Sequence, residues 1–349
     1  MQELRREAVS LPTIVAERCV HSLLATASCT ACVDACPREA WVLNDEQLGI
    51  DAARCDGCKL CAPACPQGAV QAEISPELRR SSRGVLALLA CVQSGVQAGP
   101  GVEPCLHACS HSLLTSLVHA GVTEIVACCA DCDHCERGVA SRIEDRIAQF
   151  NVLLSNRKLP RIQYRAADPS EWSDLRSSEP LITTAETLTR RQFFSRTTQA
   201  MTEAKSQLDG VETPDTAGFE PPGCILPNQS PGHLVLFLPQ IDPLQCNACG
   251  ACLKLCPNHV ITLQNPVAAY HIEPDRCTGC GVCRDVCDQG AISVLAWAVP
   301  QLLDIPLAGG RCHDCGAPYF TPVAQSSADQ LCRICAGSRN KKLLYQVFD

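Results

Sequence analysis

The chain has no long uninterrupted apolar run. Its most apolar stretch, residues 291–309, is broken by Pro300, Asp304 and Pro306, so the sequence predicts no membrane-spanning helix. The first 24 residues have no uninterrupted apolar core and no small-residue cleavage site, so we expect no secretory signal and a cytoplasmic protein.

Two common cofactor motifs are also missing. The sequence contains neither a G-x-G-x-x-G fingerprint nor a Walker A run, which argues against a dinucleotide or nucleotide site. An excess of positive charge is missing too: the formal net charge of −8 argues against a general nucleic-acid binder.

Cysteine is the abundant residue, with 28 among 349 positions. A chain without a secretory signal is expected to use so many thiols for metal rather than for disulfides. Within the clusters, neighbouring cysteines are separated by gaps of two or three residues, too close for unstrained disulfides between them. They form four groups, in residues 19–65, 91–135, 246–287 and 312–335. Only Cys224 stands alone, in a proline-rich segment, and we expect it to be an ordinary residue.

Two runs, "CDGCKLCAPACP" (55–66) and "CNACGACLKLCP" (246–257), carry the pattern C-x2-C-x2-C-x3-C-P. The region 241–295 resembles the bacterial two-cluster ferredoxins. That resemblance implies that three cysteines of each run bind one [4Fe–4S] cluster and the fourth binds the other. The implied ligand sets are Cys246, Cys249, Cys252 and Cys287 for one cluster, and Cys277, Cys280, Cys283 and Cys256 for its partner.

The N-terminal copy departs from the pattern, because Thr26 occupies the first cysteine position. The resemblance implies one cluster at Cys36, Cys55, Cys58 and Cys61, and three ligands for another at Cys29, Cys32 and Cys65. Either that site holds a three-ligand [3Fe–4S] cluster or a residue outside the run completes it. We favour Cys19, whose nine-residue connection can reach back to the cluster; His21 is a weaker substitute. Similar strands after each last cysteine, "GAV" and "GAI", indicate an internal duplication.

The region between the two copies has a different pattern. Strands are expected at 84–92, 122–129 and 161–167, and helices at 105–121 and 136–159. This alternation predicts a small parallel α/β layer whose cysteines gather at the strand C-termini.

This middle region resembles the delta subunit of methyl-viologen-reducing hydrogenase, which implies a [2Fe–2S] cluster. The sequence lacks that family's paired cysteines around position 91 and has additional ones at 128–135. A zinc site and inert buried thiols are the alternatives. The candidate cysteine ligands are Cys91, Cys105, Cys128 or Cys129, and Cys132 or Cys135. Three histidines are further candidates: His107, His111 and His134.

Near the C-terminus, residues 311–342 contain the spacing C-x2-C-x16-C-x2-C. Two such knuckles predict a zinc ribbon, with Cys312, Cys315, Cys332 and Cys335 closing a tetrahedral site. Iron in a rubredoxin-like site is the alternative.

The predicted fold class is α+β, with two ferredoxin-like dicluster modules flanking a small α/β domain. Residues 166–231 form a polar linker that cannot bury enough apolar surface to fold alone, apart from a short helix around 184–207. The expected parts are the N-terminal module (1–80), the α/β domain (81–165), the linker (166–231), the C-terminal module (232–305) and the zinc-ribbon tail (306–349).

These parts predict an iron–sulfur electron-transfer protein, a polyferredoxin. The expected partners are redox proteins, and the expected role is that of a relay subunit or adaptor of an oxidoreductase such as a formate dehydrogenase or hydrogenase. A cluster-delivery or maturation factor, or a redox sensor, is the alternative. The thiol excess at 128–135 leaves open whether the chain itself is an enzyme.

Overall fold

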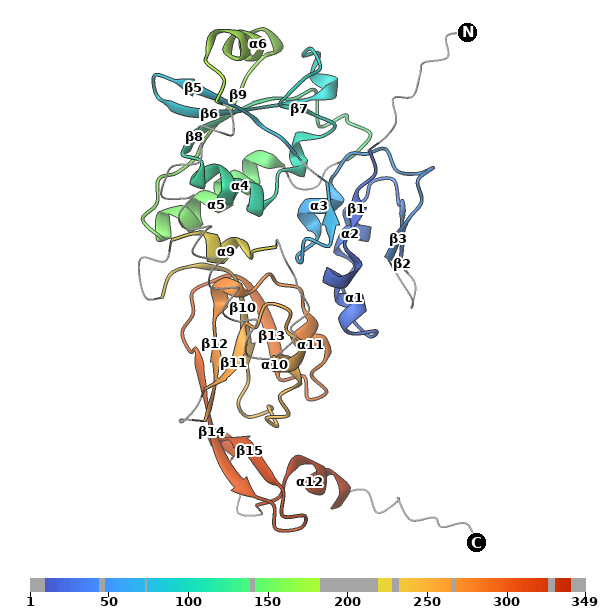
Figure 1. The fold of residues 1–349 in the computed structure, drawn as a ribbon, viewed down its shortest axis with the longest axis vertical. Helices are drawn as coiled ribbons and strands as arrows, with labels where there is room; N and C mark the ends of the chain where they lie inside the picture. Colours follow the sequence, from blue (N-terminus) through green and yellow to red (C-terminus); the bar gives the residue numbers. More distant parts are fainter. Residues whose placement is uncertain are drawn as a thin grey trace, which may run out of the picture. The chain divides into compact units, whose positions relative to one another are not determined.

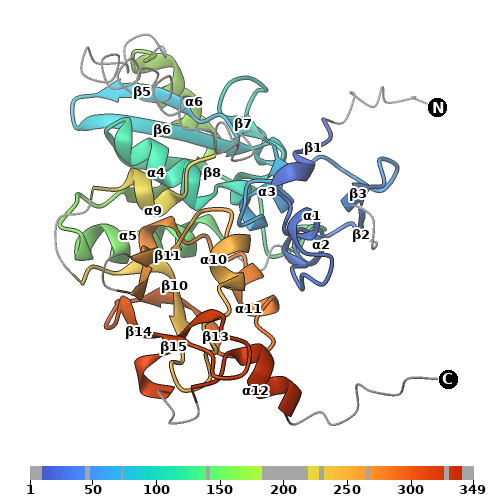
Figure 2. The ribbon, with the colours of Figure 1, turned by 60° about the horizontal axis from the view of Figure 1, so that its bottom comes forward.

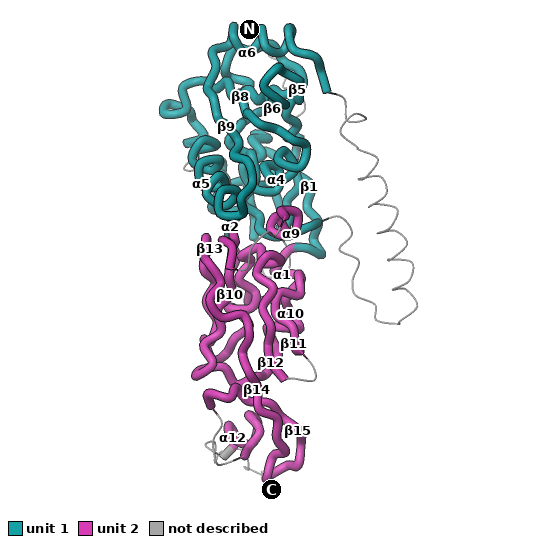
Figure 3. The backbone as a smooth tube through the Cα atoms, turned by 90° about the vertical axis from the view of Figure 1, so that its left-hand side faces the viewer, with its two compact units in different colours: residues 1–18, 30–220 teal, residues 19–29, 221–349 magenta. Residues whose placement is uncertain are grey.

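The computed structural model describes residues 10–43, 48–72, 74–138, 142–182, 219–227, 232–264, 268–325 and 330–339. The chain divides into two compact units, one formed by residues 1–18 and 30–220 and the other by 19–29 and 221–349 (Figure 3). Both contain helices and strands, as expected for the mixed α and β class. Within the described ranges, no helix combines the length and apolar character needed to cross a bilayer.

The same small arrangement occurs once in each unit. Its first strand pairs antiparallel with its last, and a hairpin lies between them in sequence. In the first unit the strands are β1 (Thr13–Ile14), β2 (Trp41–Leu43), β3 (Leu48–Ile50) and β4 (Val70–Gln71), with helices α2 (Ala31–Asp34) and α3 (Cys61–Ala64). In the second they are β10 (Val235–Ile241), β11 (Ile261–Gln264), β12 (Ala269–Ile272) and β13 (Ile292–Ala298), with α10 (Ala251–Leu255) and α11 (Val282–Asp285). This repetition agrees with an internal duplication.

A five-stranded sheet forms the rest of the first unit. Its strands are β5 (Glu77–Ser81), β6 (Gly84–Cys91), β7 (Val102–Glu103), β8 (Val122–Cys128) and β9 (Gln163–Ala166). The order is β5-β6-β8-β9, and β7 also pairs with β6. The pairings of β6 with β7 and β8, and of β8 with β9, are parallel, as the sequence predicts, whereas β5 is antiparallel. Helices α4 (His111–His119) and α5 (Ile143–Asn156) cover one face, and α6 (Pro169–Ser178) covers the other (Figure 1).

The helix expected at 105–121 is interrupted at Cys109, whose backbone is extended. A short 3-10 turn, Leu106–Ala108, precedes the break, and α4 starts afterwards with Ser110 as its N-cap. The Ser110 hydroxyl accepts a hydrogen bond from the Leu113 N–H at 3.0 Å. Serine is a favoured N-cap, so the sequence held a start signal for the later boundary.

The structure differs from the predicted linker at its start. Asp168 caps α6 by accepting hydrogen bonds from the N–H groups of Ser170 and Glu171, and Pro169 follows at the first helical position. Trp172 is fully buried against β6 and β8. One large side chain therefore fixes a segment whose average composition is polar. The helix expected around 184–207 lies outside the described residues.

The C-terminal ribbon continues a ferredoxin-module sheet. Strand β14 (Asp304–Arg311) pairs with both β12 and β15 (Pro318–Pro322), giving the order β11-β12-β14-β15. Helix α12 (Arg333–Arg339) lies beside this hairpin (Figures 1 and 2). The predicted boundary at 305/306 thus falls inside β14. The remaining short elements are η1 (Ala16–Arg18), α1 (Val20–Leu23), η2 (Val92–Ser94), α9 (Pro222–Ile225), η4 (Pro274–Arg276) and η5 (Val323–Gln325).

Candidate metal centres

The second cysteine run of the N-terminal module encloses a cavity. Its loop turns at Gly57 and Lys59, both with positive φ, before α3 starts at Cys61. Trp41 and Ile50, from the β2–β3 hairpin, close the cavity with apolar surface. The cavity is lined by all four predicted ligands of this cluster, namely Cys36, Cys55, Cys58 and Cys61. Residues 36 and 55–61 are thus brought together as the ferredoxin pattern predicts.

An equivalent cavity lies in the C-terminal module. Gly279 is required in its loop, since φ is +76° there and a Cβ atom would lie 2.5 Å from the Phe237 ring. Apolar side chains from β10, β11 and β13 complete the lining. The predicted ligands that line this cavity are Cys256, Cys277, Cys280 and Cys283.

The partner set of the C-terminal module also converges. Burial and, to a lesser extent, the nearby thiols raise the pKa of the Cys252 thiol to about 12; these neighbours are Cys246, Cys283, Cys249 and Cys287. Cys287, which comes from the second run, therefore lies close enough to act on cysteines of the first run. Thiols with such raised pKa values need a bound cation to remain thiolates at neutral pH.

Three of the four crossing cysteines accept backbone hydrogen bonds at a constant offset. The N–H group four residues further along donates to Sγ at 3.4 Å in Cys36, 3.3 Å in Cys256 and 3.4 Å in Cys287. Hydrogen bonds to cluster sulfurs stabilise negative charge there. The donors are Ala40, Val260 and Ala291.

Of the ligands predicted for the other N-terminal cluster, only Cys32 and Cys65 belong to the first unit. Cys32 and Cys65 pack with Cys36 around Trp41 and Val70. Cys19 and Cys29 belong to the other compact unit, and Cys19 precedes α1 as its N-cap. His21, the weaker substitute, places Nε2 2.8 Å from the carbonyl oxygen of Cys29. The ligation of this site by Cys19 remains a prediction.

In the middle domain, a third cavity is lined by some of the candidate cysteines and not by the others. Cys91, Cys105, Cys132 and Cys135 line it together. Cys128 instead points into the core between the sheet and α6, where it is 1% exposed. Cys129 is exposed and lies close enough to Cys132 to raise its pKa.

The three candidate histidines differ in their surroundings. His107 lines the middle cavity. Its Nδ1 accepts a hydrogen bond from the Ile143 N–H at 3.1 Å, and its Nε2 lies 3.3 Å from Sγ of Cys132. His111 packs in the core near Phe150, and burial lowers its pKa to about 4. His134 is exposed beside Asp131. Only His107 among these three adjoins the cavity.

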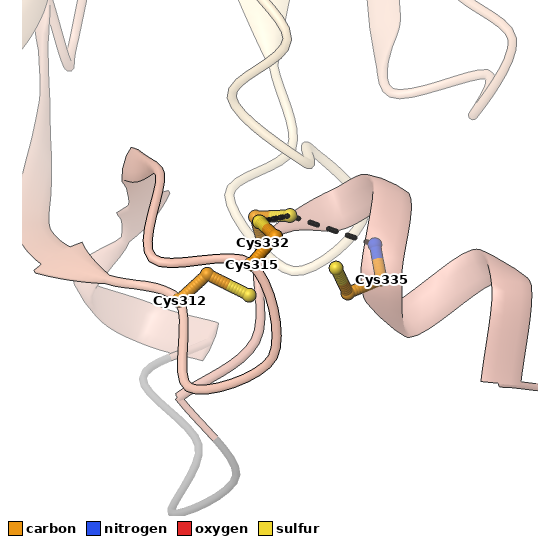
Figure 4. Close-up of side chains that lie close together, drawn as sticks. All are labelled: Cys312, Cys315, Cys332 and Cys335. Atoms are coloured by element: carbon orange, nitrogen blue, oxygen red, sulfur yellow. Dashed lines mark hydrogen bonds between the residues drawn. The ribbon is translucent and has the colours of Figure 1, made fainter.

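The ribbon cysteines form a much tighter cluster. The four Sγ atoms all lie within 4.8 Å of one another, and those of Cys315 and Cys332 are 3.7 Å apart (Figure 4). A tetrahedral zinc site with Zn–S bonds of about 2.3 Å has sulfur–sulfur edges of about 3.8 Å. Among the described residues this is the only set of three or more candidate ligands so closely spaced. The ribbon geometry therefore suits a single ion, whereas the wider cysteine sets suit larger groups.

Electrostatics at the ribbon also favour a cation. Backbone N–H groups of Cys332 and Cys315 lower the pKa of Cys312 to about 6. Cys332 and Cys315 conversely raise the pKa of Cys335. Four thiols so close together cannot all ionise without a cation to offset their charge.

Comparison with known protein families supports the cysteine sites of the two ferredoxin-like modules. The family described as 4Fe-4S dicluster domain matches residues 245–291, and the 4Fe-4S binding domain matches residues 48–71. The chain contains two ferredoxin-type iron–sulfur regions. Each of these regions is similar to a ferredoxin-type [4Fe–4S] domain, which supports [4Fe–4S] clusters at these cysteine runs.

One curated relative is hydrogenase-4 component A of Escherichia coli (strain K12), which is 28% identical over 109 residues. The alignment covers 31% of this chain and 48% of that protein. The chain thus spans about half the length of the curated relative it matches.

Proposed function

We propose that the chain is a relay subunit carrying four [4Fe–4S] clusters, a [2Fe–2S] cluster in the middle domain and a structural zinc ion in the ribbon. The observation that carries this proposal is the convergence of cysteines from separate runs on common cavities, with the predicted ligand sets at two of them. Cys19 is proposed as the fourth ligand of the remaining N-terminal cluster, and a three-ligand [3Fe–4S] cluster is the alternative.

When bound, these clusters supply reversible one-electron chemistry. The chain itself buries the thiols in part and donates N–H groups to sulfur. In the middle domain, the proposed ligands are the four cysteines that line its cavity, namely Cys91, Cys105, Cys132 and Cys135.

The proposed partner is an oxidoreductase such as a hydrogenase or formate dehydrogenase. The similarity to a protein described as a hydrogenase-4 component supports a place in such an assembly. The absence of the two nucleotide motifs from the sequence favours a subunit over a complete oxidoreductase.

A reductive titration of anaerobically purified protein tests the relay role against cluster delivery. A relay should take up and release electrons through repeated cycles with its iron content unchanged, including when an apo-enzyme is present. Loss of iron to the apo-enzyme would instead establish delivery as the function.

A further inference from the structure

Two of the proposed cluster sites contact each other within the first compact unit. Cys58 of the N-terminal site and Cys105 of the middle site belong to one buried apolar cluster with Leu60 and Ala108. The two cysteines are 7% and 6% exposed, so little water reaches this contact. A charged group placed here acts on both sites through a medium of low polarity.

Arg137 is such a group. Its side chain is 12% exposed and lines the middle cavity. The guanidinium donates a hydrogen bond to the carbonyl oxygen of Pro104, which directly precedes Cys105. Its Nε lies 3.0 Å from Oδ2 of Asp56, and Asp56 lines the N-terminal cavity.

Asp56 is in turn fixed to the N-terminal cluster loop. Its Oδ1 accepts a hydrogen bond from the Cys58 N–H at 3.2 Å. Arg38 also approaches Asp56, with Nε 3.4 Å from Oδ2, and pairs with exposed Glu136 at 3.0 Å. Two guanidinium groups thus share the Asp56 carboxylate, and Arg137 is the more buried of them.

A second ion pair joins the cysteine loop of the N-terminal site to strand β7, which precedes Cys105. Lys59 Nζ lies 2.8 Å from Oε2 of Glu103, whose side chain is 8% exposed. Glu103 also accepts a hydrogen bond from the Ser75 N–H at 2.7 Å. Since Lys59 follows Cys58 and Glu103 stands two residues before Cys105, this pair maintains the contact between the sites.

The electrostatic effect of Arg137 reaches both thiols. Burial raises the pKa of Cys58 to about 12 and also raises that of Cys105, and in each case the Arg137 charge opposes the shift. Because reduction adds negative charge to a cluster, a nearby buried cation stabilises the reduced form.

Taking the proposed clusters as given, we propose that Arg137 is a redox-tuning residue shared by the N-terminal Cys36/Cys55/Cys58/Cys61 site and the middle site. It raises the reduction potentials of both centres together. Arg137 acts through charge and position and does not itself bind a cluster.

The test uses the full chain purified anaerobically, with iron and sulfide counted before each potentiometric titration monitored by electron paramagnetic resonance. Arg137→Met should lower the midpoint potentials of both centres at unchanged iron content. Arg137→Lys, which keeps the charge, should restore most of the loss. Arg165→Met is the matched control, because Arg165 is ion-paired with Glu124 and Glu171 away from the cavities, and it should shift neither potential.

Asp56→Asn provides a variant with the opposite expected sign. Removing this carboxylate while Arg137 remains should raise both potentials, a reversal that a purely structural role would not produce. With iron retained, either variant overturns the proposal if it shifts the midpoint potential of only one centre or of neither. The proposal is also overturned if Arg137→Met and Asp56→Asn shift the potentials in the same direction.

The iron count separates this failure from failure of the proposed function. Wild-type protein without a reducible centre in the middle domain would refute both the [2Fe–2S] assignment and the shared tuning. If Arg137→Met loses iron, the Asp56→Asn titration decides: a rise in both potentials supports the proposal, and any other result overturns it.

Discussion

The backbone N–H of Val260 lies 3.3 Å from Sγ of Cys256, the cysteine that crosses from the first run of the C-terminal module to the second. Cys256 shares a cavity with Cys277, Cys280 and Cys283. A loop from one run thus brings both a thiol and a hydrogen-bond donor to the site formed by the other.

Replacing Cys256 with alanine should therefore affect the cluster of the second run. The loss of one thiolate should remove that cluster or convert it to a three-iron form, while the Cys246/Cys249/Cys252/Cys287 set is retained. Iron analysis and low-temperature electron paramagnetic resonance measure the change. Cys224→Ala is the control, because Cys224 is exposed on α9 outside the cysteine runs. Equal iron contents in the two variants would contradict the ligand assignment.

In the middle domain, Cys132→Ala and Cys128→Ala should differ sharply. Cys132 lines the cavity and its removal should abolish the centre there. Cys128 is a core residue, so its replacement should cost about 1 kcal/mol of stability and leave the centre in place. Visible circular dichroism of the anaerobic proteins reports the centre, and urea unfolding reports the stability. Loss of the signal in Cys128→Ala with retention in Cys132→Ala would reverse the assignment.

Zinc binding in the ribbon should depend on pH. In the metal-free fold, backbone N–H groups lower the pKa of Cys312 from its ordinary 9.0 to about 6. A depressed pKa means that this group stabilises the fold fully above pH 9.0 and that its contribution is lost as the pH falls through about 6. Protons compete with zinc for the thiolates, so the protein should retain zinc at neutral pH and release it progressively as the pH falls.

Release is followed with a chromogenic zinc indicator under anaerobic conditions, with iron counted in parallel. Cys332→Ser should abolish zinc retention at pH 7 without lowering the iron content of the ferredoxin modules. Retention of zinc by this variant, or recovery of iron in place of zinc, would refute the proposed ribbon site.

Trp172 should be a major source of stability in the α/β domain. Trp172→Ala removes a fully buried side chain from the core between α6, β6 and β8, and should cost about 3–5 kcal/mol in urea unfolding. Trp172→Phe should cost much less, since it keeps an aromatic ring and removes a buried indole N–H that has no acceptor among the described residues. Similar small losses for both variants would indicate that α6 is not part of the core.

Much of the site could be predicted because ligand spacing is local. The positions of Cys55, Cys58 and Cys61 follow from their two-residue gaps, and the ferredoxin pattern supplies the crossing Cys36. The middle domain was less predictable, since adjacent Cys128 and Cys129 differ in burial only through the way β8 ends. The role of Arg137 was missed, because its ion pair joins residues 81 positions apart and no local pattern marks it.

The structure also differs from the prediction at the start of the expected linker, where it forms helix α6. Average composition indicated a polar segment, but the Asp168–Pro169 helix start and the single Trp172 determine the structure there. The capping signal was present in the sequence, whereas the core position of Trp172 depends on strands that lie far away in the chain.

Iron, acid-labile sulfide and zinc, counted per chain in anaerobically purified protein and followed by a redox titration, test the central claim most directly. Four cubanes, a two-iron centre and one ribbon ion predict about 18 irons and one zinc per chain, with reversible one-electron steps. Colourless protein, or protein whose cysteines hold zinc alone, would contradict the account.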